Sequence, residues 1–209
     1  MSTQQTPVST NYSIAARLSH QTYLVRKKFW QFFGGSFYIY DPNDALVLFS
    51  KMKAFKLKED IRVFTDETLQ TEALSIQARS VLDFSGSYDV YDSASGQRVG
   101  ALRRKGLKSS FYKDEWVILD NTEKEVGLIQ EENAFLALLR KYLLGALIPQ
   151  SFNAQIGGRT VATFSQRFNL FATKLTLDFS ADPQRQFDRR IGIAAGILLC
   201  AIEGKQHSD

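Results

Sequence analysis

Cysteine is almost absent from this sequence, since Cys200 is the single one among 209 residues. One thiol excludes an internal disulfide, and with two histidines it makes no Cys/His metal cluster. A reducing, cytoplasmic setting is therefore expected, with no metal and no cofactor. The four prolines exclude an extended proline-rich tail.

Neither a signal peptide nor a membrane-spanning helix is expected. Met1–Thr10 is polar, without a basic start followed by an apolar core. The apolar run near the end of the chain, Ile191–Ile202, has twelve residues and covers about 18 Å as a helix. A bilayer core needs about 30 Å, and Arg189 and Arg190 would have to enter lipid to extend the run. The run therefore predicts a helix surrounded by protein.

Catalytic residues do not converge anywhere in the sequence. His20 and His207 lie near the two ends, and no nucleophile lies beside a base in a recognisable motif. Gly34-Gly35 and Gly157-Gly158 come before or between expected strands, where glycine pairs favour turns over phosphate-binding loops. An enzyme is not expected.

Internal repetition is the clearest positive signal. One pattern of strand, aspartate- or glycine-containing turn and strand occurs three times. The copies begin with Ser36–Phe49, Ser87–Leu102 and Ser151–Phe164. The first two copies continue into two more expected strands each, whereas the third reaches Asp182-Pro183 where its fourth strand would follow. Three such units predict a closed antiparallel barrel of about twelve strands.

The last segment is expected to be the centre of that barrel. Asp182 suits an N-cap and Pro183 the first helical position, so the sequence predicts a helix over 183–203. Small residues at Gly192 and Gly196 let such a helix fit inside a narrow barrel, with Cys200 as a buried apolar residue.

A second, amphipathic helix is expected between the second and third copies, within an insertion at 131–149. Its apolar positions recur at helical spacing. They are Phe135, Leu138, Leu139 and Tyr142. This helix either caps one end of the barrel or contacts a membrane interface or a protein partner.

The order of these features resembles the tubby C-terminal-like superfamily, which includes phospholipid scramblases and LURP-one-related proteins. The residues that carry the resemblance are Tyr23–Lys27, Ser36–Asp41, Lys51–Lys58, Tyr88–Asp92, Val99–Lys105 and Ile191–Ile202. The resemblance implies about twelve strands around the final helix and, by analogy, a lipid-binding role. The expected organisation is a tail or short helix over 1–20, one barrel domain over 21–204 and a tail over 205–209.

Basic residues supply the candidate binding site. With 26 Lys and Arg against 22 Asp and Glu, the net charge is +4, which favours an anionic partner. Two corresponding stretches are rich in lysine and arginine. They contain Lys51, Lys53, Lys56 and Lys58 in the first copy, and Arg103, Arg104, Lys105 and Lys108 in the second. These residues form either one patch for an anionic ligand or a solvated outer face that protects strand edges.

Three functions remain open from the sequence. The first is a non-enzymatic domain that binds phospholipid headgroups or a membrane surface through its basic strands, in the cytoplasm and peripheral to the membrane. The second is a protein-interaction module that uses the inserted helix. The third, DNA binding through the same basic strands, is the least favoured.

Overall fold

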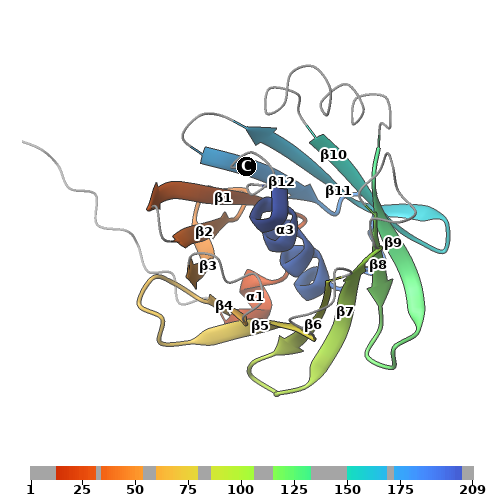
Figure 1. The fold of residues 1–209 in the computed structure, drawn as a ribbon, viewed down its shortest axis with the longest axis horizontal. Helices are drawn as coiled ribbons and strands as arrows, with labels where there is room; N and C mark the ends of the chain where they lie inside the picture. Colours follow the sequence, from red (N-terminus) through yellow and green to blue (C-terminus); the bar gives the residue numbers. More distant parts are fainter. Residues whose placement is uncertain are drawn as a thin grey trace, which may run out of the picture.

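The strands of the computed structural model form one closed barrel (Figure 1). The structure describes residues 13–31, 34–53, 60–79, 86–105, 115–132, 150–168 and 172–203. The strands are β1 (Thr22–Gln31), β2 (Gly34–Tyr40), β3 (Leu46–Lys53), β4 (Ile61–Phe64), β5 (Glu72–Ala78), β6 (Ser87–Asp92), β7 (Arg98–Arg104), β8 (Glu115–Leu119), β9 (Glu125–Glu131), β10 (Gln150–Ile156), β11 (Arg159–Phe168) and β12 (Ala172–Asp178). The described helices are α1 (Ile14–Arg17) and α3 (Arg189–Glu203).

Each strand pairs antiparallel with its neighbours in the sequence, and β1 closes the ring against β12. The first two repeated units form β2–β5 and β6–β9, and the third forms β10–β12. β1 takes the place of the fourth strand that the third unit lacks. The predicted twelve-strand antiparallel barrel is therefore confirmed.

Aspartate residues shape the turns at one end of the barrel, as the repeat predicted. The Asp41 carboxylate accepts hydrogen bonds from the backbone N–H groups of Asn43 and Ala45. Asp120 accepts from the N–H groups of Thr122 and Lys124 in the same way. A carboxylate that accepts from backbone N–H groups a few residues later stabilises a tight turn, which is why aspartate recurs there.

Helix α3 runs along the inside of the barrel (Figure 1), and every residue from Ile191 to Ala201 is buried. The inward-facing strand residues and α3 share one apolar cluster. Cys200 is buried within it as a free thiol. The prediction of a buried central helix is confirmed, and the apolar character of the helix is explained by the strands that enclose it.

The two ends of the barrel are distinguished by the direction of α3. We call the end where α3 begins the helix-start end; it also has the short turns between β2 and β3, β4 and β5, β6 and β7, β8 and β9, and β10 and β11. The helix-finish end holds the last residues of β1, β3, β5, β7, β9 and β11 and the end of α3. At this end the Lys27 ammonium donates to the Cys200 carbonyl over 3.2 Å, which places a positive charge at the negative end of the helix dipole.

The predicted start of the central helix was wrong by six residues, since α3 begins at Arg189 and not at Pro183. The Asp182 carboxylate accepts from the N–H groups of Gln186 and Phe187, which closes a turn before the helix. Arg185 has φ of +53°, a left-handed conformation that interrupts any right-handed helix through this point.

The predicted insertion at 131–149 also began too early, because Glu131 is the last residue of β9 and pairs with Phe152 of β10. The remaining expectation, a helix that includes Phe135, Leu138, Leu139 and Tyr142, lies outside the described residues.

Candidate functional site

The predicted basic residues lie at the helix-finish end on two separate strands. Lys51 is exposed near the end of β3, and Lys53 ends that strand. Arg103 and Arg104 end β7, and Lys105 follows them. The other members of the predicted site, Lys56, Lys58 and Lys108, lie outside the described residues.

The two basic stretches are not neighbours on the barrel, because β4, β5 and β6 lie between β3 and β7. The β7 stretch also has acidic partners. Arg103 pairs with Glu125, and the Lys105 ammonium lies 2.6 Å from a Glu115 carboxylate oxygen. Arg104 is half-buried and lies on the opposite face of β7 from Arg103, since side chains alternate along a strand. The positive charge at the end of β7 is therefore largely compensated.

A different set of cations extends from Lys51 across the neighbouring strands to β11. Lys174 of β12 lies directly opposite Arg26 of β1 on one side and Arg167 of β11 on the other. One step nearer the helix-finish end, the backbone register brings Lys28 of β1 and Lys51 of β3 opposite the same residue of β2, Ser36. We call Arg26, Lys51, Arg167 and Lys174 the basic band; it spans the outer face of five adjacent strands.

Cations directly opposite one another in a sheet repel, which destabilises the fold. Only part of this repulsion is offset in the described part of the chain. The Arg26 guanidinium lies 3.0 Å from an Asp44 oxygen and 4.6 Å from the centre of the Tyr40 ring. Lys51, Arg167 and Lys174 are exposed and make no ion pair with any described residue. Lys51, Arg167 and Lys174 are therefore the part of the basic band without a compensating carboxylate among the described residues.

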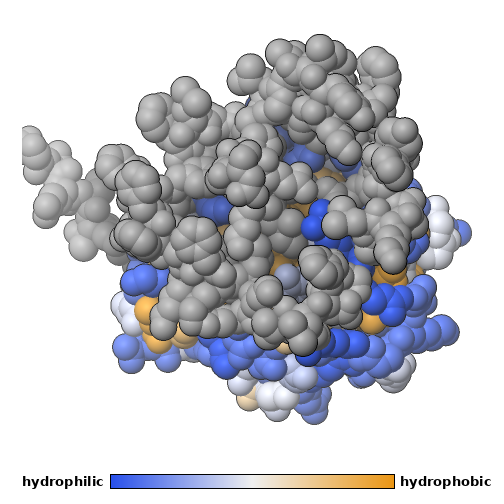
Figure 2. Space-filling view, in the orientation of Figure 1, coloured by the Kyte–Doolittle hydropathy of each residue, from blue (hydrophilic) through white to orange (hydrophobic). Residues whose placement is uncertain are grey.

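Hydrophobic side chains contribute little to the visible surface. The described residues shown in Figure 2 are mostly hydrophilic, with small and separate hydrophobic patches. Among the described residues, Leu69 is the only large hydrophobic side chain that is exposed, and it lies in the turn between β4 and β5 at the helix-start end. The contribution of the basic band that the described residues support is therefore electrostatic.

Inside the barrel, five consecutive strands place polar side chains in the core near the helix-finish end. This polar inner wall consists of Glu131, Gln150, Gln166, Thr173 and Lys27, each more than nine-tenths buried. Gln150 lies opposite Gln166, and Lys27 lies opposite Thr173. Within the part of the chain that the structure describes, the side-chain oxygen and nitrogen of Gln166 and the hydroxyl of Thr173 have no hydrogen-bond partner. Unpaired polar atoms in a core are energetically unfavourable.

Replacing Gln166 with methionine is therefore expected to stabilise the protein. Methionine keeps the length of the side chain and removes the two unpaired polar groups. The free energy of unfolding should rise by about 1–2 kcal/mol, measured by urea denaturation. The matched control Gln130→Met changes a half-buried glutamine on the outer face and should shift the value by less than about 0.5 kcal/mol. A loss of stability in Gln166→Met alone would show that the amide is paired in solution.

Within the described residues no helix is long and apolar enough to cross a membrane, and no group of three or more His, Cys, Asp or Glu residues is arranged to hold a metal ion.

Comparisons with known proteins agree with this architecture. A closed twelve-strand barrel around an apolar helix defines the tubby-like class of proteins. The family model described as LURP-one-related matches residues 46–199, so the chain belongs to the LURP-one-related family of that class. A search of the curated proteins found no match.

Proposed function

We propose that this protein is a non-enzymatic, cytoplasmic domain that binds anionic phospholipid headgroups at a membrane surface through the basic band. The observation that carries the proposal is the direct opposition of Arg26, Lys174 and Arg167 on three neighbouring strands. An anionic surface offsets the repulsion within this row. Membership of a tubby-like family supports the proposal at the level of the fold.

The expected mode of binding is peripheral and reversible. Each lysine or arginine near an anionic membrane contributes about 1 kcal/mol, and this attraction falls off within about 10 Å at 0.1 M salt. Three or four such residues therefore give the protein a weak to moderate affinity for an anionic membrane. Because the described surface exposes few large apolar side chains, insertion into the hydrocarbon core is not part of the proposal.

Vesicle co-sedimentation tests this function. The full chain should bind vesicles that contain 30 mol% phosphatidylserine and should not bind phosphatidylcholine vesicles, and 0.5 M NaCl should release it. The double variant Arg167→Glu and Lys174→Glu should bind at least about tenfold more weakly, since it reverses two charges.

The control is Lys124→Glu, which reverses an exposed charge in the turn between β8 and β9 at the other end of the barrel. It should bind as the native chain does. Equal binding to neutral and anionic vesicles, or undiminished binding by the double variant, would contradict the proposal. Stronger binding to duplex DNA than to anionic vesicles would favour the nucleic-acid alternative.

The predicted role of the inserted helix in protein interaction stays a separate proposal. Deleting residues 133–149 and joining Glu132 to Gln150 through a short glycine-serine linker would separate the two, because the basic band lies entirely outside this segment. Vesicle binding should persist in the deletion variant if the basic band carries it.

A further inference from the structure

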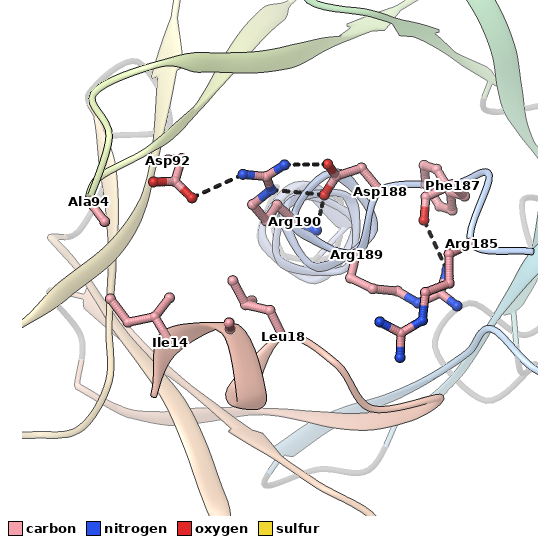
Figure 3. Close-up of a pocket in the computed structure, with 10 residues that line it drawn as sticks. Ile14, Leu18, Asp92, Ala94, Arg185, Phe187, Asp188, Arg189 and Arg190 are labelled. Atoms are coloured by element: carbon pink, nitrogen blue, oxygen red, sulfur yellow. Dashed lines mark hydrogen bonds and ion pairs between the residues drawn. The ribbon is translucent and has the colours of Figure 1, made fainter. Parts of the chain in front are cut away.

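A pocket of about 440 Å³ opens at the helix-start end, between α1 and the first turn of α3 (Figure 3). It lies at the opposite end of the barrel from the end where the basic strands finish. Its volume is within the range of sites that bind small molecules. Its walls combine apolar side chains with charged ones, so a ligand must be complementary to both.

One wall of the pocket is apolar. Ile14 begins α1 and Leu18 is its C-cap, four residues later, so the two side chains lie on the same side of that helical turn. Ala94, in the turn between β6 and β7, and Phe187, just before α3, add to the apolar lining. This wall suits an aliphatic or aromatic group.

The opposite wall carries a closed ionic network. The Arg190 guanidinium lies 2.6 Å from Asp188 and 3.0 Å from Asp92, between the two carboxylates (Figure 3). The hydrogen bonds that Arg190 donates to Asp188, and then to Asp92, raise the pKa of Arg190. Desolvation acts to raise the pKa of Asp92, but the hydrogen bonds from Ser95 and Arg190 outweigh it and lower that pKa. Two carboxylates thus surround one guanidinium, so this network carries a net negative charge and Arg190 does not attract a ligand anion.

Arg189 is held behind this wall. Its guanidinium donates to Asp182 over 2.8 Å and to the Phe187 carbonyl over 2.9 Å, and it stacks over the Phe179 ring at 4.2 Å. The side chain is more than nine-tenths buried, yet its Nε atom has no hydrogen-bond partner among the described residues. A buried donor without an acceptor therefore lies in the lining of the pocket.

Arg185 is the cation that remains uncompensated. It donates one hydrogen bond of 3.1 Å, to the Ser19 carbonyl, and has no carboxylate partner among the described residues. It lines the same pocket as Ile14 and Leu18. A guanidinium without a carboxylate partner among the described residues, beside an apolar wall, is complementary to a molecule with one anionic group and an apolar body.

We infer that this pocket binds a small amphipathic carboxylate. Arg185 receives the carboxylate, and the apolar body lies against Ile14, Leu18 and Phe187. The inference does not depend on the proposed function, because it uses none of the residues of the basic band.

Decanoate is a suitable probe, and isothermal titration calorimetry on the full chain is the measurement. At concentrations well below those at which micelles form, decanoate should bind saturably with one molecule per chain. Decylamine, which has the same chain length and the opposite charge, should bind at least about tenfold more weakly.

Two variants test the two walls separately. Arg185→Gln should weaken decanoate binding about tenfold or more, because it removes the cation. Ala94→Trp should abolish binding by filling the pocket from an exposed turn, without removing a core side chain. Arg159→Gln, which removes an exposed arginine at the start of β11, is the matched control and should bind decanoate normally.

Circular dichroism melting curves establish that the variants are folded. Three results would each overturn the inference: no saturable binding of decanoate, equal binding of decylamine, or undiminished binding by folded Arg185→Gln. Vesicle binding by Arg185→Gln should be unchanged, so the proposal for the pocket and the proposal for the basic band are tested independently.

Discussion

Replacing Asp182 with alanine is expected to lower the free energy of unfolding by about 3–5 kcal/mol, because it leaves the buried Arg189 guanidinium without its carboxylate. Asp182 is 3% exposed and Arg189 is 7% exposed, so water cannot take the place of the lost partner. The same carboxylate accepts from the N–H groups of Gln186 and Phe187, and these donors lose their acceptor too. Thermal unfolding should show a fall in Tm of about 6–20 °C.

Two further variants separate the buried charge from other effects. Asp182→Leu combined with Arg189→Met removes both charges and should recover part of the lost stability, since it leaves no unpaired ion. Glu72→Gln removes one partner of the exposed Arg62–Glu72 pair and should change the free energy of unfolding by about 1 kcal/mol or less. If Asp182→Ala and Glu72→Gln had equal effects, burial would not be the reason for the strength of the first pair.

The stability that Asp182 contributes should also depend on pH. Desolvation acts to raise the pKa of Asp182, but the N–H of Phe187, the Arg189 guanidinium and the N–H of Gln186 outweigh it and lower that pKa. A carboxyl group with a lowered pKa in the folded state stabilises the fold above its unfolded pKa, near 4, and this contribution is lost as pH falls through the folded pKa. The difference between the native chain and Asp182→Ala should therefore shrink as the pH drops below about 4, measured by urea denaturation at several pH values.

Replacing Gly192 with alanine should destabilise the protein, although alanine is the better helix former. A Cβ atom at Gly192 would lie 2.4 Å from Cζ of Phe179 and 3.3 Å from Cε1 of Phe187. Phe179 is fully buried between Tyr23, Phe187 and the Arg189 guanidinium, so its ring has little room to move. Overpacking of this kind costs about 1–3 kcal/mol or more, which exceeds the gain of about 1 kcal/mol in helix propensity.

Gly196 is the matched control, one helical turn further along α3. A Cβ atom there would lie 3.4 Å from Leu175 and 3.7 Å from Val25, which are close to ordinary contacts. Gly196→Ala should therefore be neutral or stabilise the fold by up to about 1 kcal/mol. Urea denaturation should separate the two variants by about 2 kcal/mol; the same change in both would mean that Phe179 does not limit the approach of the helix.

The architecture could be predicted because it depends on local and repeated signals. The three copies of the strand–turn–strand pattern give the number of strands, and the short uncharged length of Ile191–Ile202 predicts that the helix is buried in protein. The start of α3 could not be predicted this way. Asp182 and Pro183 look like the first residues of a helix, but the Asp182 side chain closes a turn with Gln186 and Phe187 instead.

The basic band could not be predicted, for a different reason. Arg26 and Lys174 become neighbours only when β1 closes the barrel against β12, and no pattern near either residue specifies that register. The local sequence predicts Lys51 as a binding residue, but the repeat predicts that its cationic neighbours lie on β7, at the corresponding place of the second copy. In the barrel, three strands separate β7 from β3, and the basic residues of β7 have acidic partners.

The closure of β1 on β12 has a consequence for how the chain folds. Val25 and Leu175 are paired although they are 150 positions apart, so the last seam of the barrel forms only after a very long loop has closed. Proteins dominated by such distant pairings fold slowly, because chain entropy is lost before the contacts that offset it are made. Until β12 and α3 take their places, the inward faces of the other strands have no core to cover them. We expect slow refolding through an intermediate in which the barrel is still open, and this intermediate should aggregate at high protein concentration. Conditions that favour pairing of β1 with β12 should raise the yield of folded protein.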